Sequence, residues 1–284
     1  MLGAIIGDIM GSAYEANPIK TKDIPRFNPK GRMTDDSRLT FGVAKVLLDH
    51  YPFTFSSESL VAIQEDLKVK FSNIVRGDYY AGWGASFFEW ARMPNSIKEP
   101  YNSYGNGSAM RISSVGWLAK TEEEVKILSK TVSEITHNHP EGLKGAEAIA
   151  MCIFLARQGK TKEEIKDYVI KNYYPRLIGL SYDLLLKYYQ FDVSCQGSVP
   201  EAIFSFLISQ SLEDAIKTAI SLGGDSDTLA AMAGSIAEAY YQSEELSDFE
   251  QDFLDRVIDL HDENLIIQLH TVIHSPKFLR NRDI

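Results

Sequence analysis

Apolar residues recur at intervals of three and four positions along most of this chain. Leu39, Val43 and Val46 show the spacing, which places their side chains on one face of a helix. Thr-x-x-Glu pairs at 121–124 and 161–164 are capping boxes, which mark the first turn of a helix. Helices are therefore expected over residues 2–16, 35–50, 57–73, 80–90, 109–119, 121–135, 142–158, 180–190, 200–210, 213–222, 228–242, 247–260 and 263–273, with a further one from 161.

Strand signals are weak by comparison. We find no convincing alternation of apolar and polar residues, no repeat of fixed period, and only short connections between the expected helices. The pattern predicts an all-α fold, a single orthogonal-type multi-helix domain over residues 1–284 with about a dozen helices. With 44% apolar residues, the chain has enough hydrophobic side chains for a sizeable core.

The first expected helix carries two unusual stripes. Glycine stands at positions 3, 7 and 11, so one side of the helix would allow another helix to approach closely. Asp8, Ser12 and Glu15 form a polar stripe beside it. The polar stripe indicates either a functional face or a solvated edge, and the spacing leaves both interpretations open.

Two acidic motifs stand at the starts of expected helices. Residues 34–37 have the sequence TDDS, and residues 223–228 have the sequence GGDSDT. Each motif alone is explained by helix capping, because Asp, Ser and Thr begin helices and Gly ends them. If the two motifs converged, four carboxylates would repel one another unless a divalent cation neutralised them. Oxygen ligands of this kind suit Mg²⁺, and two ions would form a clamp that orients a substrate.

Composition narrows the class of partner. The formal net charge of −10 argues against nucleic acid or an anionic membrane as a partner, but it allows a small anion held by backbone amides. Cys152 and Cys195 are too few for a disulfide framework. The sequence shows no signal peptide and no apolar run of membrane-spanning length, so a cytoplasmic protein is expected.

A loop rich in Gly and Asn lies in the middle of the chain. Gly105, Asn106 and Gly107 tolerate unusual backbone angles and precede an expected helix, so their amides would suit a phosphate or diphosphate. An ordinary turn has the same composition. Further along, His137 and His139 are either metal ligands or, in so tight a loop, one capping and one exposed histidine.

Taken in order along the chain, these motifs resemble those of the ADP-ribosylglycohydrolase family. The matching segments are Gly7-Asp8 through Gly11 to Glu15, Thr34-Asp35-Asp36-Ser37, Ser103 to Gly107 with Met110-Arg111 and Thr136-His137, and Gly223 to Thr228. The resemblance spans nearly the whole chain. It implies an all-α fold with a binuclear Mg²⁺ centre in a cleft, where Mn²⁺ is an expected substitute.

The resemblance also assigns roles to individual residues. It implies metal ligation by Thr34, Asp35, Asp36, Asp225, Asp227 and Thr228. It implies catalysis by Glu15, with Asp35 and Asp36 as the other carboxylates from which the general base would come. It implies binding of the diphosphate and distal ribose by Ser103, Tyr104, Gly105, Asn106 and Gly107, with His137 lining the pocket.

Two positions depart from the family pattern. Ser37 stands where the family usually has Thr, which keeps the hydroxyl. Arg38 stands where a small or apolar residue is usual; it would alter the cleft if it pointed inward, and we favour an outward position because Arg tends to stay exposed.

The activity implied by the resemblance is hydrolysis of the bond between C1″ of ADP-ribose and an acceptor atom. Such a reaction needs an activated water and assistance to the leaving group. The expected substrate is an ADP-ribosylated protein or a small ADP-ribose conjugate, and the protein is expected to be a monomer. Two alternatives stay open: an ADP-ribose-binding module without turnover, and a structural protein on the same fold, as an eye-lens crystallin that resembles the family is.

Overall fold

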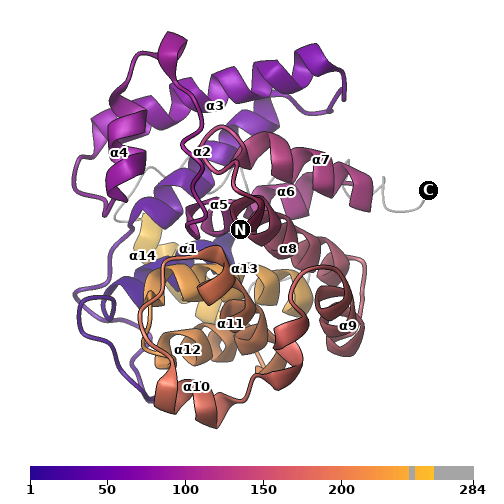
Figure 1. The fold of residues 1–284 in the computed structure, drawn as a ribbon. Helices are drawn as coiled ribbons and strands as arrows, with labels where there is room; N and C mark the ends of the chain where they lie inside the picture. The colour runs from indigo at the N-terminus through magenta and orange to yellow at the C-terminus, as the bar shows by residue number, and fades with distance from the viewer. Residues whose placement is uncertain (243–246, 259–284) are drawn as a thin grey trace.

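The computed structural model describes residues 1–242 and 247–258 of the chain (Figure 1). Within these ranges the chain forms fourteen α-helices, two short 3-10 helices and no β-strand, which confirms the all-α prediction. The helix expected over 263–273 lies outside the described residues. The α-helices are α1 (Leu2–Ser12), α2 (Asp35–Asp49), α3 (Ser57–Gly77), α4 (Ala85–Arg92), α5 (Gly107–Met110), α6 (Ser113–Leu118), α7 (Glu122–Ser133), α8 (Pro140–Arg157), α9 (Lys162–Asn172), α10 (Tyr182–Tyr188), α11 (Cys195–Ile208), α12 (Leu212–Ser221), α13 (Ser226–Tyr241) and α14 (Asp248–Ile258). The 3-10 helices are η1 (Asn95–Ile97) and η2 (Pro175–Gly179).

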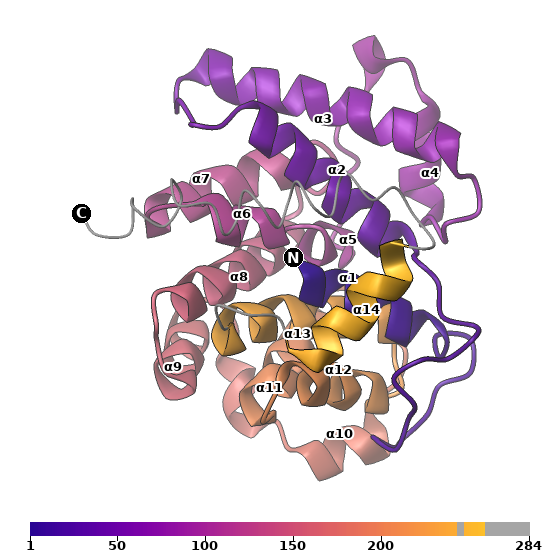
Figure 2. The ribbon, with the colours of Figure 1, turned by 180° about the vertical axis from the view of Figure 1, so that it is seen from behind.

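Helix α13 forms the centre of the fold. It packs against α1, α8, α11 and α12, and nearly all of its side chains are buried. Helices α2, α3 and α4 lie on one side of the α1–α13 pair and α10 to α12 on the other (Figure 1). From behind, α14 lies across α1 (Figure 2). The start of α13, which carries one acidic motif, is therefore held by neighbours on several sides.

The glycine stripe of α1, predicted to allow close approach of another helix, is the contact surface with α13. A Cβ atom built on Gly7 would lie 2.6 Å from the backbone nitrogen of Ala231, and one built on Gly11 would lie 2.6 Å from that of Asp227. Gly3 meets α13 in the same way. Because real Cβ atoms do not approach backbone this closely, only glycine lets α1 lie at its observed distance from α13.

Several helix boundaries differ from the prediction; α11, for example, begins at Cys195 rather than at residue 200, and α3 extends to Gly77. Helix α1 ends at Ser12, whose hydroxyl bonds the backbone of Arg32, so Glu15 lies beyond the helix. Helix α4 begins only at Ala85, because Gly82 has a φ of +102°, which an α-helix does not accommodate. The helix expected over 109–119 is divided into α5 and α6, and Gly116 brings α6 close to α8.

Candidate active site

The two acidic motifs meet at one cavity. Thr34 is the N-cap of α2 and Asp225 is the N-cap of α13, so both helices point their N-terminal ends toward the same space. The Thr34 side chain caps α2, as the simple explanation required. Asp225, however, makes no capping bond; its Oδ2 accepts a 2.7 Å hydrogen bond from Nδ2 of Asn106 instead. Capping alone therefore does not explain the second motif.

Asp8 is the residue that joins the first helix to this site. Its side chain is fully buried, so the solvated-edge interpretation is wrong at this position. Asp8 Oδ2 accepts hydrogen bonds from the backbone nitrogens of Thr34 (2.9 Å) and Ser37 (3.0 Å), and from the Ser37 hydroxyl. Asp8 Oδ1 accepts a 2.7 Å bond from Thr34 Oγ1. Ser37 stands where the family usually has Thr, and the hydroxyl that it keeps is thus a donor to Asp8.

Carboxylate oxygens gather in two adjoining groups. Asp8, Asp36 and Asp227 each place one oxygen within 4.8 Å of the others, and so do Glu15, Asp225 and Asp227. Asp227 belongs to both groups. The sequence-based ligand set omitted Asp8, although its place in the polar stripe of α1 was the signal that could have identified it.

The predicted ligands differ in how they reach this cluster. Thr228 Oγ1 donates a 3.2 Å hydrogen bond to Asp36 Oδ2, whereas Asp36 Oδ1 is buried and has no hydrogen-bond partner among the described residues. Thr34 already uses its hydroxyl proton on Asp8, which leaves an oxygen lone pair. Asp35 lines the cavity but belongs to neither carboxylate group. A buried carboxylate oxygen without a donor fits a cation, which would supply the missing partner.

Burial and mutual repulsion act on the proton affinity of these groups. Loss of hydration raises the pKa of Asp36 and Asp227 well above the ordinary carboxyl value, and repulsion from neighbouring carboxylates adds to the effect. The pKa of Asp35 is raised well above that value for the same two reasons. Burial, followed by repulsion from Asp225, raises the pKa of Glu15. A bound divalent cation would reverse this preference, because it favours the ionised form.

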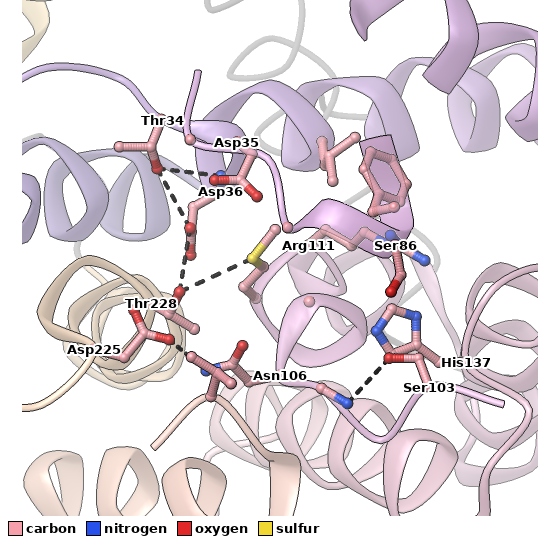
Figure 3. A pocket seen from close by; sticks show the side chains of 18 of the residues that line it. Thr34, Asp35, Asp36, Ser86, Ser103, Asn106, Arg111, His137, Asp225 and Thr228 are labelled. Carbon is pink, nitrogen blue, oxygen red and sulfur yellow. Dashed lines mark hydrogen bonds between the residues drawn. The ribbon is translucent and has the colours of Figure 1, made fainter. Parts of the chain in front are cut away.

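The cavity continues from the carboxylates to the predicted binding loop (Figure 3). Its volume is about 520 Å³; the acidic groups lie at one end and Ser103 and His137 at the other, with Asn106 beside Asp225. Phe191 and Val193, both about half exposed, also line it. The segment from Gly82 to Phe87 forms a further part of the wall, which sequence reasoning did not identify.

The loop residues assigned to the substrate all line the cavity, but not all of their amides are free. The backbone nitrogen of Gly105 donates to Ser103 Oγ at 3.2 Å, and that of Asn106 donates to the carbonyl of Val193 at 2.8 Å. Asn106 instead presents its side chain to Asp225. The role of Ser103 to Gly107 in holding a diphosphate stays a prediction, and it depends on atoms other than these two amides.

The remaining sequence-based expectations concern three side chains. Arg38 forms an ion pair with Asp78 at 2.9 Å and does not line the cavity, in agreement with the outward position. His139 caps α8 by accepting from the backbone nitrogen of Glu141 at 3.1 Å. His137 is not exposed: it is buried at the cavity wall.

Comparison with known proteins identifies the family of this chain. The model of the ADP-ribosylglycohydrolase family matches residues 1–274. ADP-ribosylhydrolase ARH3 of Gallus gallus is 26% identical, covering 87% of this chain and 85% of the relative. ADP-ribosylarginine hydrolase Tri1 of Pseudomonas putida (strain GB-1) is 24% identical, covering 85% of this chain and 69% of the relative. A solved structure described as an ADP-ribosylglycohydrolase-related protein complex shares the fold, with a TM-score of 0.67 and 22% identity over 94% of this chain and 95% of the other.

The fold, the acidic cavity and these matches define a hydrolase that acts on glycosyl bonds. The chain belongs to the ADP-ribosylglycohydrolase family. Among the described helices, none is both long and apolar enough to cross a membrane.

Proposed function

We propose that this protein is a Mg²⁺-dependent hydrolase that releases ADP-ribose from modified protein side chains or small conjugates. The observation that carries the proposal is the pair of carboxylate groups sharing Asp227 at one end of a cavity large enough for a nucleotide-sized ligand. The named relatives are an ADP-ribosylhydrolase and an ADP-ribosylarginine hydrolase, which supports ADP-ribose as the group released.

The donor set fits two hard cations. Asp8, Asp36 and Asp227 would hold one ion and Asp225 and Asp227 the other, with Glu15 beside the second ion and Mn²⁺ as a substitute for Mg²⁺. Thr34 and Thr228 would contribute hydroxyl oxygens as ligands. Asp35 lines the cavity wall outside both carboxylate groups. When bound, the ions would supply Lewis-acid polarisation of the ribose hydroxyls and of a water molecule.

The chain's own residues would orient the substrate and deprotonate the attacking water. Glu15 is the general base we favour, because it lies beyond the end of α1 and lines the cavity beside Asp225 and Asp227. Asp36 accepts a hydrogen bond from Thr228 through one oxygen, which suits a positioning role better. Ser103, Tyr104 and Gly107 would hold the diphosphate and distal ribose.

The test is release of ADP-ribose from defined conjugates. ADP-ribosyl-arginine, -serine and -cysteine peptides, ADP-ribosylated nucleic acid and O-acetyl-ADP-ribose would be incubated with the protein and Mg²⁺. The proposal expects turnover of at least one conjugate, loss of turnover in Asp227→Asn, and normal turnover in Asp167→Asn, which removes an exposed carboxylate of α9.

Other results would favour the other two interpretations. Tight binding of ADP-ribose with no turnover of any conjugate would favour a binding module. Absence of both ADP-ribose binding and turnover would favour a structural protein. The retention of every predicted ligand carboxylate argues against the structural interpretation.

A further inference from the structure

The acidic end of the cavity leaves one buried charge on the opposite wall unexplained. Arg111 lines the cavity with a guanidinium that is fully buried and forms no ion pair with a described carboxylate. Its group lies 4.7 Å from the ring centroid of Phe71 and 5.8 Å from that of Phe87. Nε and Nη1 have no hydrogen-bond partner within the described residues, and Nη2 donates to Thr136 Oγ1 at 2.7 Å.

The Thr136 hydroxyl has one proton and two possible acceptors for it. His137 Nδ1 lies 2.7 Å from Thr136 Oγ1, whereas the carbonyl oxygen of Ser133 lies 3.4 Å away. That carbonyl already accepts from the backbone nitrogens of His137 (2.8 Å) and Thr136 (3.1 Å), which occupy its two lone pairs. Since hydroxyl hydrogen bonds are usually near 2.7–2.8 Å, the proton belongs to the bond with His137.

The direction of this bond determines the tautomer of the imidazole. If Nδ1 accepts, the single proton of a neutral ring is on Nε2. Nε2 faces the binding loop, since Cβ atoms built on Gly107 and Gly105 would lie 3.5 Å and 3.8 Å from it. It has no protein partner among the described residues, and Figure 3 shows the His137 ring beside Ser103 at the cavity wall.

The surroundings also keep the ring neutral. Burial, and then the positive charge of Arg111, hold the pKa of His137 well below its ordinary value. Within residues 1–242 and 247–258, no carboxylate is hydrogen-bonded to the imidazole. The ring is therefore a neutral hydrogen-bond donor aimed into the cavity.

We propose that Arg111 and Thr136 are positioning residues that fix His137 in the Nε2–H tautomer, so that it donates to an acceptor oxygen of the ligand diphosphate. Arg111 donates to one lone pair of Thr136, and this leaves the hydroxyl proton to point at His137. The identity of the ligand rests on the proposed function, whereas the tautomer is a property of the protein without ligand.

Two Thr136 variants test the hydrogen-bond relay from Arg111 through Thr136 to His137. Thr136→Val removes the hydroxyl at nearly constant volume, and Thr136→Ser keeps it. Nitrogen-15 NMR of the imidazoles, assigned with His137→Gln, reports which ring nitrogen carries the proton. We expect Nε2–H in the wild type and in Thr136→Ser, and a mixture of tautomers in Thr136→Val. Arg111→Met should also give a mixture if it folds; the Thr136 pair decides the question if it does not.

Binding of ADP-ribose, measured by calorimetry, provides the second readout. Loss of one oriented donor should weaken binding by about tenfold in Thr136→Val, with near-normal affinity in Thr136→Ser. Thr136→Val also removes the hydrogen-bond partner of Arg111, so its melting temperature should fall, and affinities are compared at a temperature where both variants are folded. Nδ1–H in the wild type, or Thr136→Ser behaving like Thr136→Val, would overturn the relay. A wild type with the Nε2–H tautomer and no affinity for ADP-ribose would contradict the ligand and the proposed function while supporting the relay.

Discussion

The close contact between α1 and α13 predicts a large effect from a small substitution. Gly7→Ala adds one methyl group where it would lie 2.6 Å from the nitrogen of Ala231 and closer still to the carbonyl of Ala230. Both are backbone atoms, so no side chain can rotate away. The two helices must separate, and the residue after Gly7 is Asp8, which lies opposite Asp227 in the acidic site.

The expected cost follows from two opposing terms. Overpacking a core contact typically costs about 1–3 kcal/mol, and a backbone clash belongs near the upper end. Replacing Gly by Ala inside a helix stabilises the folded state by about 1 kcal/mol, because Ala has the higher helix propensity. The net loss is therefore about 2 kcal/mol, which in a protein of this size lowers the melting temperature by roughly 4–8 °C.

A matched control uses the same substitution at an open position. Gly77 ends α3, and a Cβ atom there would meet nothing within 4 Å. Gly77→Ala should leave the melting temperature unchanged or raise it slightly, because it only restricts the unfolded chain. Thermal melts of the wild type and both variants, with calorimetric Mg²⁺ titrations, make the comparison. A Gly7→Ala protein with the stability and Mg²⁺ affinity of Gly77→Ala would refute the reasoning.

Three further predictions concern the site. Burial and repulsion raise the pKa of Asp36 and Asp227, so protonation of these two groups stabilises the metal-free fold, and this stability should be lost as the pH rises above the ordinary carboxyl range of about 4. The rise in melting temperature that Mg²⁺ produces should therefore grow with pH, and a rise that became smaller at higher pH would contradict this. Gly107→Val should weaken ADP-ribose binding without unfolding the protein, because its Cβ lies at ordinary contact distance from His137 but inside the cavity; unchanged affinity by calorimetry would mean that the loop is only a turn. Glu15→Gln should keep Mg²⁺ and ADP-ribose affinity near the wild type while slowing single-turnover release by about 10²–10⁴-fold, and normal release would move the general base to Asp35 or Asp36.

The sequence was most informative where a pattern had one physical solution. Glycine at every fourth position of α1 predicted a close helix contact, and the structure has α13 there. Hydroxyl–carboxylate motifs at two helix starts left capping and convergence on one site both open, and the family resemblance implied convergence. The described structure brings both motifs to one cavity.

The sequence was least informative where tertiary contacts decide the outcome. The apolar periodicity near Arg111 suggested one continuous helix, yet the chain breaks there into α5 and α6. The spacing of Asp8 left a functional face and a solvated edge both open, and only the fold shows that Thr34 and Ser37 donate four hydrogen bonds to it. Neither a helix break nor a long-range hydrogen bond leaves a local signature in residue spacing.

The central claim is that the carboxylate cluster holds divalent cations which the hydrolysis of ADP-ribose conjugates requires. The most direct measurement is release of ADP-ribose from ADP-ribosyl-serine and ADP-ribosyl-arginine peptides by metal-stripped protein, titrated with Mg²⁺. The account predicts no release in chelator, saturable recovery with Mg²⁺ for at least one peptide, and little recovery in Asp227→Asn. Full release in chelator, or undiminished recovery in Asp227→Asn, would contradict it.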